Sequence, residues 1–224
     1  MLHQKSKKIF IYLFLFLIIG TLNNKNINNF YFFKINTISI KGLDEKNNNK
    51  LSKDLNFLIF NNLFFLDKLK INEVVSSNNL IENFSVFRKY PSSLEIIINK
   101  TDFLARIKKD DKDFILGSNG RLITASNDTL NLPFIFGNFD IENFFNLKKA
   151  IDETNLDYNE IKNLYSFKSG RWDIETKNGL IIKLPKDDLK RILELYLIFI
   201  SENKEKKINT IDLRQLNQII INGR

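Results

Sequence analysis

Residues 87–107 read FRKYPSSLEIIINKTDFLARI, and the joint between two predicted domains lies within this stretch. The apolar run Ser93–Asn99 (SLEIIIN) predicts a strand, and Ile81–Phe87 before it predicts another. Pro91 has no N–H to donate to a strand ladder, so it belongs to the connection RKYP or to the first position of a strand. Phe103–Ile107 predicts a third strand. We therefore expect one domain to end, and the next to begin, between the last two strands.

The segment upstream of the joint predicts a small mixed domain. Ile35–Gly42 (INTISIKG) alternates apolar and polar residues, which is typical of a half-buried strand that ends at a glycine turn. Apolar residues at helical spacing predict helices near Asn47–Phe60 and from about Lys70 to Asn79. The expected order is strand, helix, helix, strand, strand, with a core of Ile38, Ile40, Leu55, Val74, Ile96 and Ile98.

The segment downstream of the joint predicts mostly strands. Asn119-Gly120 and Asn178-Gly179 each lie between apolar runs, which is a strong signal for a β-hairpin. Helices are expected at about Ile141–Glu153 and Asp187–Glu202, and the two aspartates that open the second one suit a helix N-terminus. The pattern indicates a mainly antiparallel β-domain with two helices.

The N-terminal segment has the pattern of a membrane anchor. Three lysines within residues 1–8 come just before the apolar run Ile9–Leu22. As a helix this run covers only about 21 Å of a ~30 Å hydrocarbon layer, which taken alone favours a cleaved signal peptide. The first alanine of the chain is Ala105, however, so no small-residue cleavage site follows the run. We therefore expect a cytoplasmic tail over 1–8, an uncleaved transmembrane anchor over 9–29, and a single-pass type II topology in the inner membrane, with the bulk of the chain in the periplasm.

The composition argues against an enzyme. The 224 residues contain no cysteine, which excludes disulfides and thiolate metal sites. The single histidine, His3, lies in the predicted cytoplasmic tail, so no histidine base, triad or zinc site can form beyond it. The sequence has no P-loop, G-x-G-x-x-G or G-x-S-x-G motif. We predict no catalytic residue, no metal site and no cofactor.

The net charge of +8 leaves a second function class open. Such a charge suits a basic exported binding module for an anionic ligand, such as nucleic acid or cell-wall polymer. The lysines, however, are scattered through every segment instead of gathering in one patch. A nucleic-acid reader should show clustered cations among exposed aromatic residues, and it would not normally be exported.

Five stretches together resemble the FtsQ family of bacterial cell-division proteins, called DivIB in other bacteria. They are ISIKG (38–42), the opening stretch (87–107), LGSNGRLI (116–123), LPFIFG (132–137), and GRWDIETKNGLIIKLPKDDLKRILEL (170–195) followed by IDLR (211–214). Their order and spacing cover nearly the whole chain. The resemblance implies an α+β protein with a short N-terminal transmembrane helix, a POTRA domain (β-α-α-β-β) over 34–101 and an FtsQ-type β-domain over 102–224.

The resemblance also implies a function. The family consists of non-enzymatic, membrane-anchored scaffolds of the division machinery, concentrated at the septum. FtsB/FtsL-like bitopic proteins would bind in the periplasm by adding a strand, and other membrane proteins of the divisome would meet the anchor and the POTRA domain. No nucleic acid is expected as a partner.

The closing strands are the expected docking site. Ile208–Leu213 and Asn217–Ile221 are rich in β-branched residues, and their open edge suits β-augmentation. An alternative is that Ile219 and Ile221 only pack on the core. A second expected contact is a recognition corner beside Pro91, for which a solvated turn is the alternative. The residues predicted to bind partners are Arg171, Arg214, Gln215, Leu216, Asn217, Gln218, Ile219, Ile220 and Ile221 at the edge, and Arg88 and Tyr90 at the corner.

Overall fold

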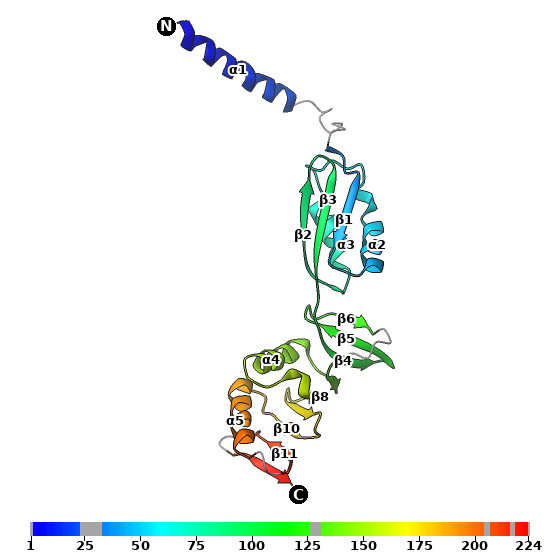
Figure 1. Ribbon diagram of the computed structural model, residues 1–224, viewed down its shortest axis with the longest axis vertical. Helices are drawn as coiled ribbons and strands as arrows, with labels where there is room; N and C mark the ends of the chain where they lie inside the picture. Colours follow the sequence, from blue (N-terminus) through cyan, green and yellow to red (C-terminus); the bar gives the residue numbers. More distant parts are fainter. Residues whose placement is uncertain (1, 23–32, 126–130, 204–206, 216–217, 224) are drawn as a thin grey trace. The chain divides into compact units, whose positions relative to one another are not determined.

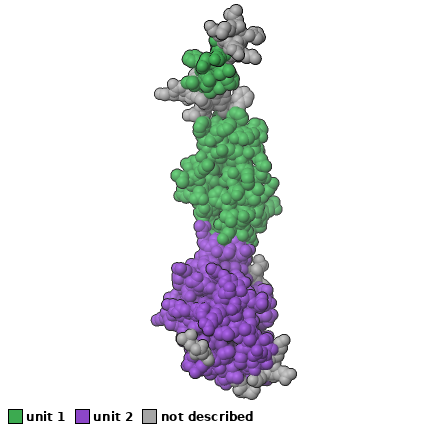
Figure 2. Space-filling model, turned by 90° about the vertical axis from the view of Figure 1, so that its left-hand side faces the viewer, with its two compact units in different colours: residues 1–100 green, residues 101–224 purple. Residues whose placement is uncertain are grey.

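A computed structural model describes residues 2–22, 33–125, 131–203, 207–215 and 218–223. The chain forms two compact units, Met1–Lys100 and Thr101–Arg224, which are coloured separately in Figure 2. Figure 1 shows the elements of each unit. Each unit has a hydrophobic core of its own.

The expected membrane-spanning helix at 9–29 is wrong. Helix α1 runs over Leu2–Leu22 and therefore takes up the N-terminal lysines as well as the apolar run. The apolar part that remains is short, about 21 Å against a ~30 Å hydrocarbon layer. Within the residues that the structure describes, no helix is both long and apolar enough to cross a membrane. The predicted type II topology rested on this helix and is not confirmed.

The first unit has the element order expected of a POTRA domain. Its three-stranded sheet has the order β1-β3-β2, in which β1 runs parallel and β2 antiparallel to β3. Of the predicted core, three side chains are fully buried, and the other three are half-buried and pack against the core. The elements are β1 (Thr37–Lys41), α2 (Glu45–Asp54), the 3-10 turn η3 (Asn56–Leu58), α3 (Lys68–Ser76), β2 (Ile81–Lys89) and β3 (Ser93–Lys100).

The long helix expected over 47–60 is instead α2 followed by η3. The cause is a tertiary contact. Phe60 N–H donates to the Ile35 carbonyl at 2.9 Å, and Ile35 N–H donates to the Asn61 carbonyl at 3.0 Å. These bonds draw the backbone after η3 onto the strand that enters the sheet, so the helix cannot continue.

The second unit is a nine-stranded mixed sheet with two helices. The strand order is β12-β11-β10-β9-β8-β7-β4-β5-β6. Five of the eight pairings among the described residues are antiparallel and three are parallel, namely β4 with β7, β7 with β8, and β10 with β11. The elements are β4 (Phe103–Lys109), β5 (Lys112–Gly117), β6 (Leu122–Thr124), β7 (Phe134–Phe136), α4 (Ile141–Asp152), the 3-10 turn η4 (Tyr158–Glu160), β8 (Ile161–Ser166), β9 (Trp172–Thr176), β10 (Ile181–Lys183), α5 (Leu189–Glu202), β11 (Ile208–Asp212) and β12 (Ile220–Gly223).

Both hairpins that the Asn-Gly pairs predict are confirmed, because β5 pairs with β6 and β9 with β10. The two predicted helices are present as α4 and α5, which begin and end within two residues of the predicted bounds. Alternate residues of the strands enter the core that the helices cover. These core positions include Ile135, Leu164, Ile174, Ile182 and Ile211, and they pack with Phe144, Leu147, Leu193 and Tyr196.

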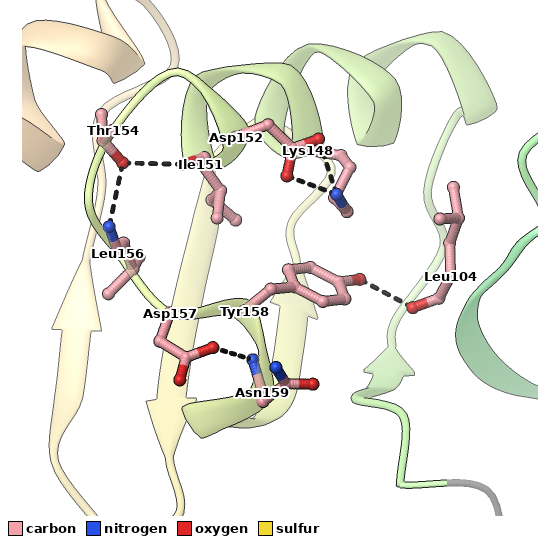
Figure 3. A network of polar contacts seen from close by, with 9 residues as sticks. All are labelled: Leu104, Lys148, Ile151, Asp152, Thr154, Leu156, Asp157, Tyr158 and Asn159. Carbon is pink, nitrogen blue, oxygen red and sulfur yellow. Dashed lines mark hydrogen bonds and ion pairs between the residues drawn. The ribbon is translucent and has the colours of Figure 1, made fainter.

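Tyr158, in η4, ties the end of α4 to the sheet (Figure 3). Its hydroxyl donates to the Leu104 carbonyl of β4 at 2.8 Å. Lys148 of α4 lies over the tyrosine ring, 4.6 Å from its centroid, and its ammonium also binds Asp152 at 2.6 Å. Burial, with a smaller contribution from Asp152, raises the pKa of the Tyr158 hydroxyl well above its usual range. The hydroxyl therefore remains a hydrogen-bond donor.

Candidate functional site: the β12 edge

Strand β12 is one edge of the nine-stranded sheet. It pairs antiparallel with β11, with Asp212 opposite Ile220 and Ile211 opposite Ile221. The strand begins at Ile220, three residues later than the predicted start at Asn217. Of the predicted docking residues, Leu216 and Asn217 lie outside the described part of the chain.

A groove of about 620 Å³ lies beside this edge, between the first half of α5 and the connection from β11 to β12. Its apolar part includes Ile192, Leu195 and Ile219. Side chains next to it are also exposed, since Ile220 and Ile221 are 46% and 44% accessible. The full lining is Pro185, Lys186, Asp187, Asp188, Arg191, Ile192, Leu195, Leu213, Arg214, Gln215, Gln218 and Ile219. The groove thus contains four of the predicted docking residues.

Charged residues cross the sheet toward the edge. Lys183 of β10 lies opposite Asp173 of β9 on one side and opposite Asp212 of β11 on the other. Cross-strand pairs of opposite charge stabilise a sheet. Because Asp212 is in turn opposite Ile220 of β12, this row of alternating charge ends at the exposed strand.

Arg214 is already bonded within the chain. Its Nε donates to Asp212 Oδ1 at 2.8 Å, its Nη2 donates to Oδ2, and its backbone N–H donates to Oδ1 at 3.1 Å. The side-chain bonds from Arg214 hold the pKa of Asp212 below its usual range. An acidic residue of a partner would therefore have to share this guanidinium with Asp212.

Arg171 lies on the turn between β8 and β9. Its Nε donates to Ser169 Oγ at 3.0 Å, and its guanidinium lies over the Phe167 ring, 5.5 Å from the centroid. Burial raises the pKa of Asp173, and the cations Lys183, Arg214 and Arg171 oppose that rise. The fold thus brings the two predicted arginines, 43 positions apart in the sequence, to act on one carboxylate.

Sequence reasoning missed the charge row and most of the groove. A signal for the row was present in WDIET, where Asp173 and Glu175 alternate with buried residues. The groove had no such signal, since it forms where α5 passes the connection between the last two strands. Among the described residues, no group of three acidic or histidine side chains could hold a metal ion.

The predicted corner of Arg88 and Tyr90 belongs to the first unit. Both residues line a groove of about 600 Å³ between α3 and β2, together with Leu66 and Lys68. The Tyr90 ring also packs against Phe64, with centroids 5.5 Å apart. The corner thus combines a groove with an aromatic contact.

A small β-α-α-β-β unit followed by a mixed sheet with an open edge defines a two-domain protein of the POTRA-containing class. Comparison with known families gives the same division. The model described as "POTRA domain, FtsQ-type" matches residues 33–100, and "Cell division protein FtsQ/DivIB, C-terminal" matches residues 105–214. The chain belongs to the FtsQ/DivIB family of cell-division proteins.

The chain is similar to individual DivIB proteins. Cell division protein DivIB of Clostridium botulinum (strain Loch Maree / Type A3) is 29% identical over 133 residues, which is 59% of this chain and 50% of the relative. DivIB of Clostridium tetani is 24% identical over 182 residues, or 80% and 68% of the two chains. The chain thus spans about half the length of the Clostridium botulinum relatives. The solved major extracytoplasmic domain of DivIB from Geobacillus stearothermophilus is 13% identical, with a TM-score of 0.36 over 47% of this chain and 96% of that domain.

Proposed function

We propose that this chain is a non-enzymatic scaffold of the division machinery, and that it captures an extended segment of a small division protein at β12. The observation that carries the proposal is the position of β12 as an exposed apolar edge strand beside a groove. An edge of this kind is a template for pairing with another chain. The family resemblance implies FtsB/FtsL-like partners.

The second unit has another edge, β6, which is less suited to this task. It contains only Leu122–Thr124, and the side chains of Leu122 and Ile123 are half-buried. The isoleucines of β12 are more exposed and continue into the apolar lining of the groove. A partner strand would therefore find both backbone groups and a place for its side chains at β12, which is how β-augmentation combines affinity with specificity.

The register of β12 indicates the pattern of the partner segment. The side chains of Ile211 and Ile221 form one row across the sheet, on the face that α5 covers. Those of Asp212 and Ile220 form the next row, on the opposite face. An added strand continues both rows, because side chains alternate between the two faces. We expect an apolar residue of the partner on the α5 face, and a polar residue beside the charge row.

Two proline substitutions test this mode of binding. Consecutive N–H groups of a strand point to opposite sides. One of Ile220 and Ile221 therefore donates toward β11, and the other donates outward. Ile220→Pro and Ile221→Pro should then differ. Proline at the outward donor should leave the protein folded and abolish pull-down of the extracytoplasmic segment of the FtsB-like protein from the same bacterium, because a ladder bond is lost.

The control variants are Ile220→Val and Ile221→Val, which keep every backbone donor. They should bind within about tenfold of the unchanged protein, because most of the affinity comes from the main chain. Thermal melts on all four variants separate lost binding from lost folding. If both proline variants stay folded and still capture the segment, β12 is not the docking edge.

At the β12 edge, no specific observation favours the alternative of nucleic acid or cell-wall polymer as the ligand. The cations at this end of the sheet lie among carboxylates, since Arg191 pairs with Asp188 at 3.6 Å and Arg214 pairs with Asp212. A site for nucleic acid or an anionic polymer would need a surface of uncompensated positive charge.

A further inference from the structure

The segment 60–69 of the first unit, whose backbone bonds to Phe33 and Ile35, exposes a group of apolar side chains, which we call the aromatic end. It includes Tyr90, which lies in the connection from β2 to β3. Three of its side chains protrude, with Phe60 71%, Phe65 68% and Leu69 84% exposed. Scattered exposed apolar residues are ordinary, whereas a contiguous patch marks an interaction site. The aromatic end consists of Phe33, Phe60, Phe64, Phe65, Leu69 and Tyr90.

Ring contacts join part of this surface. Phe33 and Phe64 meet edge to face with centroids 4.9 Å apart, and both rings approach Tyr90, at 6.0 and 5.5 Å. The backbone beneath is fixed, because Leu63 N–H donates to the Phe33 carbonyl at 2.8 Å and the Leu63 side chain is fully buried. The exposed rings are therefore presented by a firmly bonded segment.

Phe60 has an unfavourable backbone conformation. Its φ is +66°, a region in which glycine and asparagine are at ease and aromatic residues are strained. Its side chain buries little that could offset this strain. A strained residue with an exposed apolar side chain suggests selection for the surface that it presents.

Cations border the aromatic end. Lys68 and Arg88 line one groove with Tyr90. Lys70 lies over the Phe57 ring, 4.5 Å from its centroid, and Lys89 pairs with Glu95 at 3.3 Å while remaining 62% exposed. These four cations outnumber Glu95 and Asp67, and Glu95 is itself paired with two lysines. The rim is therefore basic.

We propose that the aromatic end of the first unit rests on the surface of an anionic lipid bilayer. Phe60, Phe65 and Leu69 would enter the boundary between headgroups and acyl chains, and the basic rim would face the headgroups. Protruding aromatic residues with flanking Lys and Arg suit this interface, and the binding strength scales with apolar area and with attraction to anionic lipid.

The protruding form of these side chains favours lipid over a protein partner. Protein hot spots are aromatic anchors that fill pockets, with matching pockets on the other side. Here the most exposed side chains, at residues 60, 65 and 69, line neither of the two larger grooves described above. The contact needs no helix that crosses the bilayer.

A tryptophan reporter tests the contact in the full chain. The probe is vesicles of phosphatidylglycerol and phosphatidylcholine in equal amounts, with brominated acyl chains. We expect the added indole of Phe65→Trp to be quenched and blue-shifted. The matched control, Ile97→Trp, replaces a 40% exposed residue of β3 and should be unaffected. The chain's own tryptophan, Trp172, is fully buried and gives a constant background.

A second variant keeps the result interpretable. Phe60→Asn with Leu69→Gln, placed in the Phe65→Trp background, should reduce vesicle affinity by roughly tenfold or more. The melting temperature should stay or rise, because asparagine tolerates the φ of residue 60. Added salt should weaken binding of the unmodified surface. Equal quenching of the two reporters would mean that the chain reaches lipid through another segment, and no quenching of either would leave a protein partner as the occupant. Either result overturns the proposal.

Discussion

The carboxylate of Glu175 should make the second unit sensitive to acid. It lies on the sheet face that α4 and α5 leave uncovered, and it accepts three hydrogen bonds. Tyr165 Oη donates at 2.6 Å, Asn163 Nδ2 at 2.9 Å and Lys162 Nζ at 3.1 Å. These donors, led by Tyr165, lower the pKa of Glu175 from 4.5 to about 2. All three favour the ionised form.

The lowered pKa of Glu175 determines how the stability of the second unit changes with pH. Because the pKa is lower in the folded state, the contribution to stability is present above the ordinary carboxyl pKa and is lost as pH falls toward about 2. A pKa lowered from 4.5 to about 2 corresponds to at most about 3 kcal/mol. Solvent reaches the cluster and screens it, so we expect about 1–2 kcal/mol.

Urea unfolding followed by Trp172 fluorescence measures this effect, since the only tryptophan of the chain is buried in the second unit. Between about pH 7 and pH 3 the unchanged protein should lose about 1 kcal/mol more than Glu175→Gln, because the other carboxylates titrate in both and the loss is completed only near pH 2. Tyr165→Phe should give an intermediate difference. If Glu175→Gln and the unchanged protein lose equal stability, the network does not lower the pKa of Glu175, and the reasoning fails.

Three further substitutions test the packing of the second unit. Gly137→Ala should cost about 3 kcal/mol or more of unfolding free energy, because a Cβ there would lie 2.3 Å from the Ser166 carbonyl oxygen. The control Gly179→Ala has a similar positive φ but nothing within 4 Å, so it should cost only about 1 kcal/mol. Equal urea midpoints for the two variants would contradict this. Tyr158→Phe should cost about 1–2 kcal/mol, because it leaves the Leu104 carbonyl without its donor, and an unchanged midpoint would show that water replaces the bond.

The elements predicted correctly from the sequence are those whose conformation depends on adjacent residues. Asn119-Gly120 and Asn178-Gly179 specify their hairpins through the backbone conformation of two adjacent positions, and both hairpins are confirmed. The helix expected over 47–60 failed because its end is set by bonds to Ile35, which no local pattern encodes. The start of β12 was misplaced for a similar reason, since its register depends on pairing with β11.

The candidate site was predictable only in part. Its edge strand follows from β-branched residues near the C-terminal end of the sequence, but its groove needs the third dimension. Arg214 shows the difference most clearly. Its charge suggested a contact for an acidic partner, whereas the fold pairs it with Asp212 two residues earlier. Charge alone does not show whether a side chain is available.

The connection from β10 to β11 explains how the edge is presented. These two strands are parallel, so the chain must cross over between them, and α5 is that crossover. Leu193 and Tyr196 of α5 are buried against the same core as Ile182 and Ile211, which fixes the helix to both strands. One packed unit therefore sets the position of β11, the edge strand that pairs with it, and one wall of the groove. An edge held in this way needs little ordering before it pairs, and pre-organisation of that kind lowers the entropic cost of capturing an extended segment.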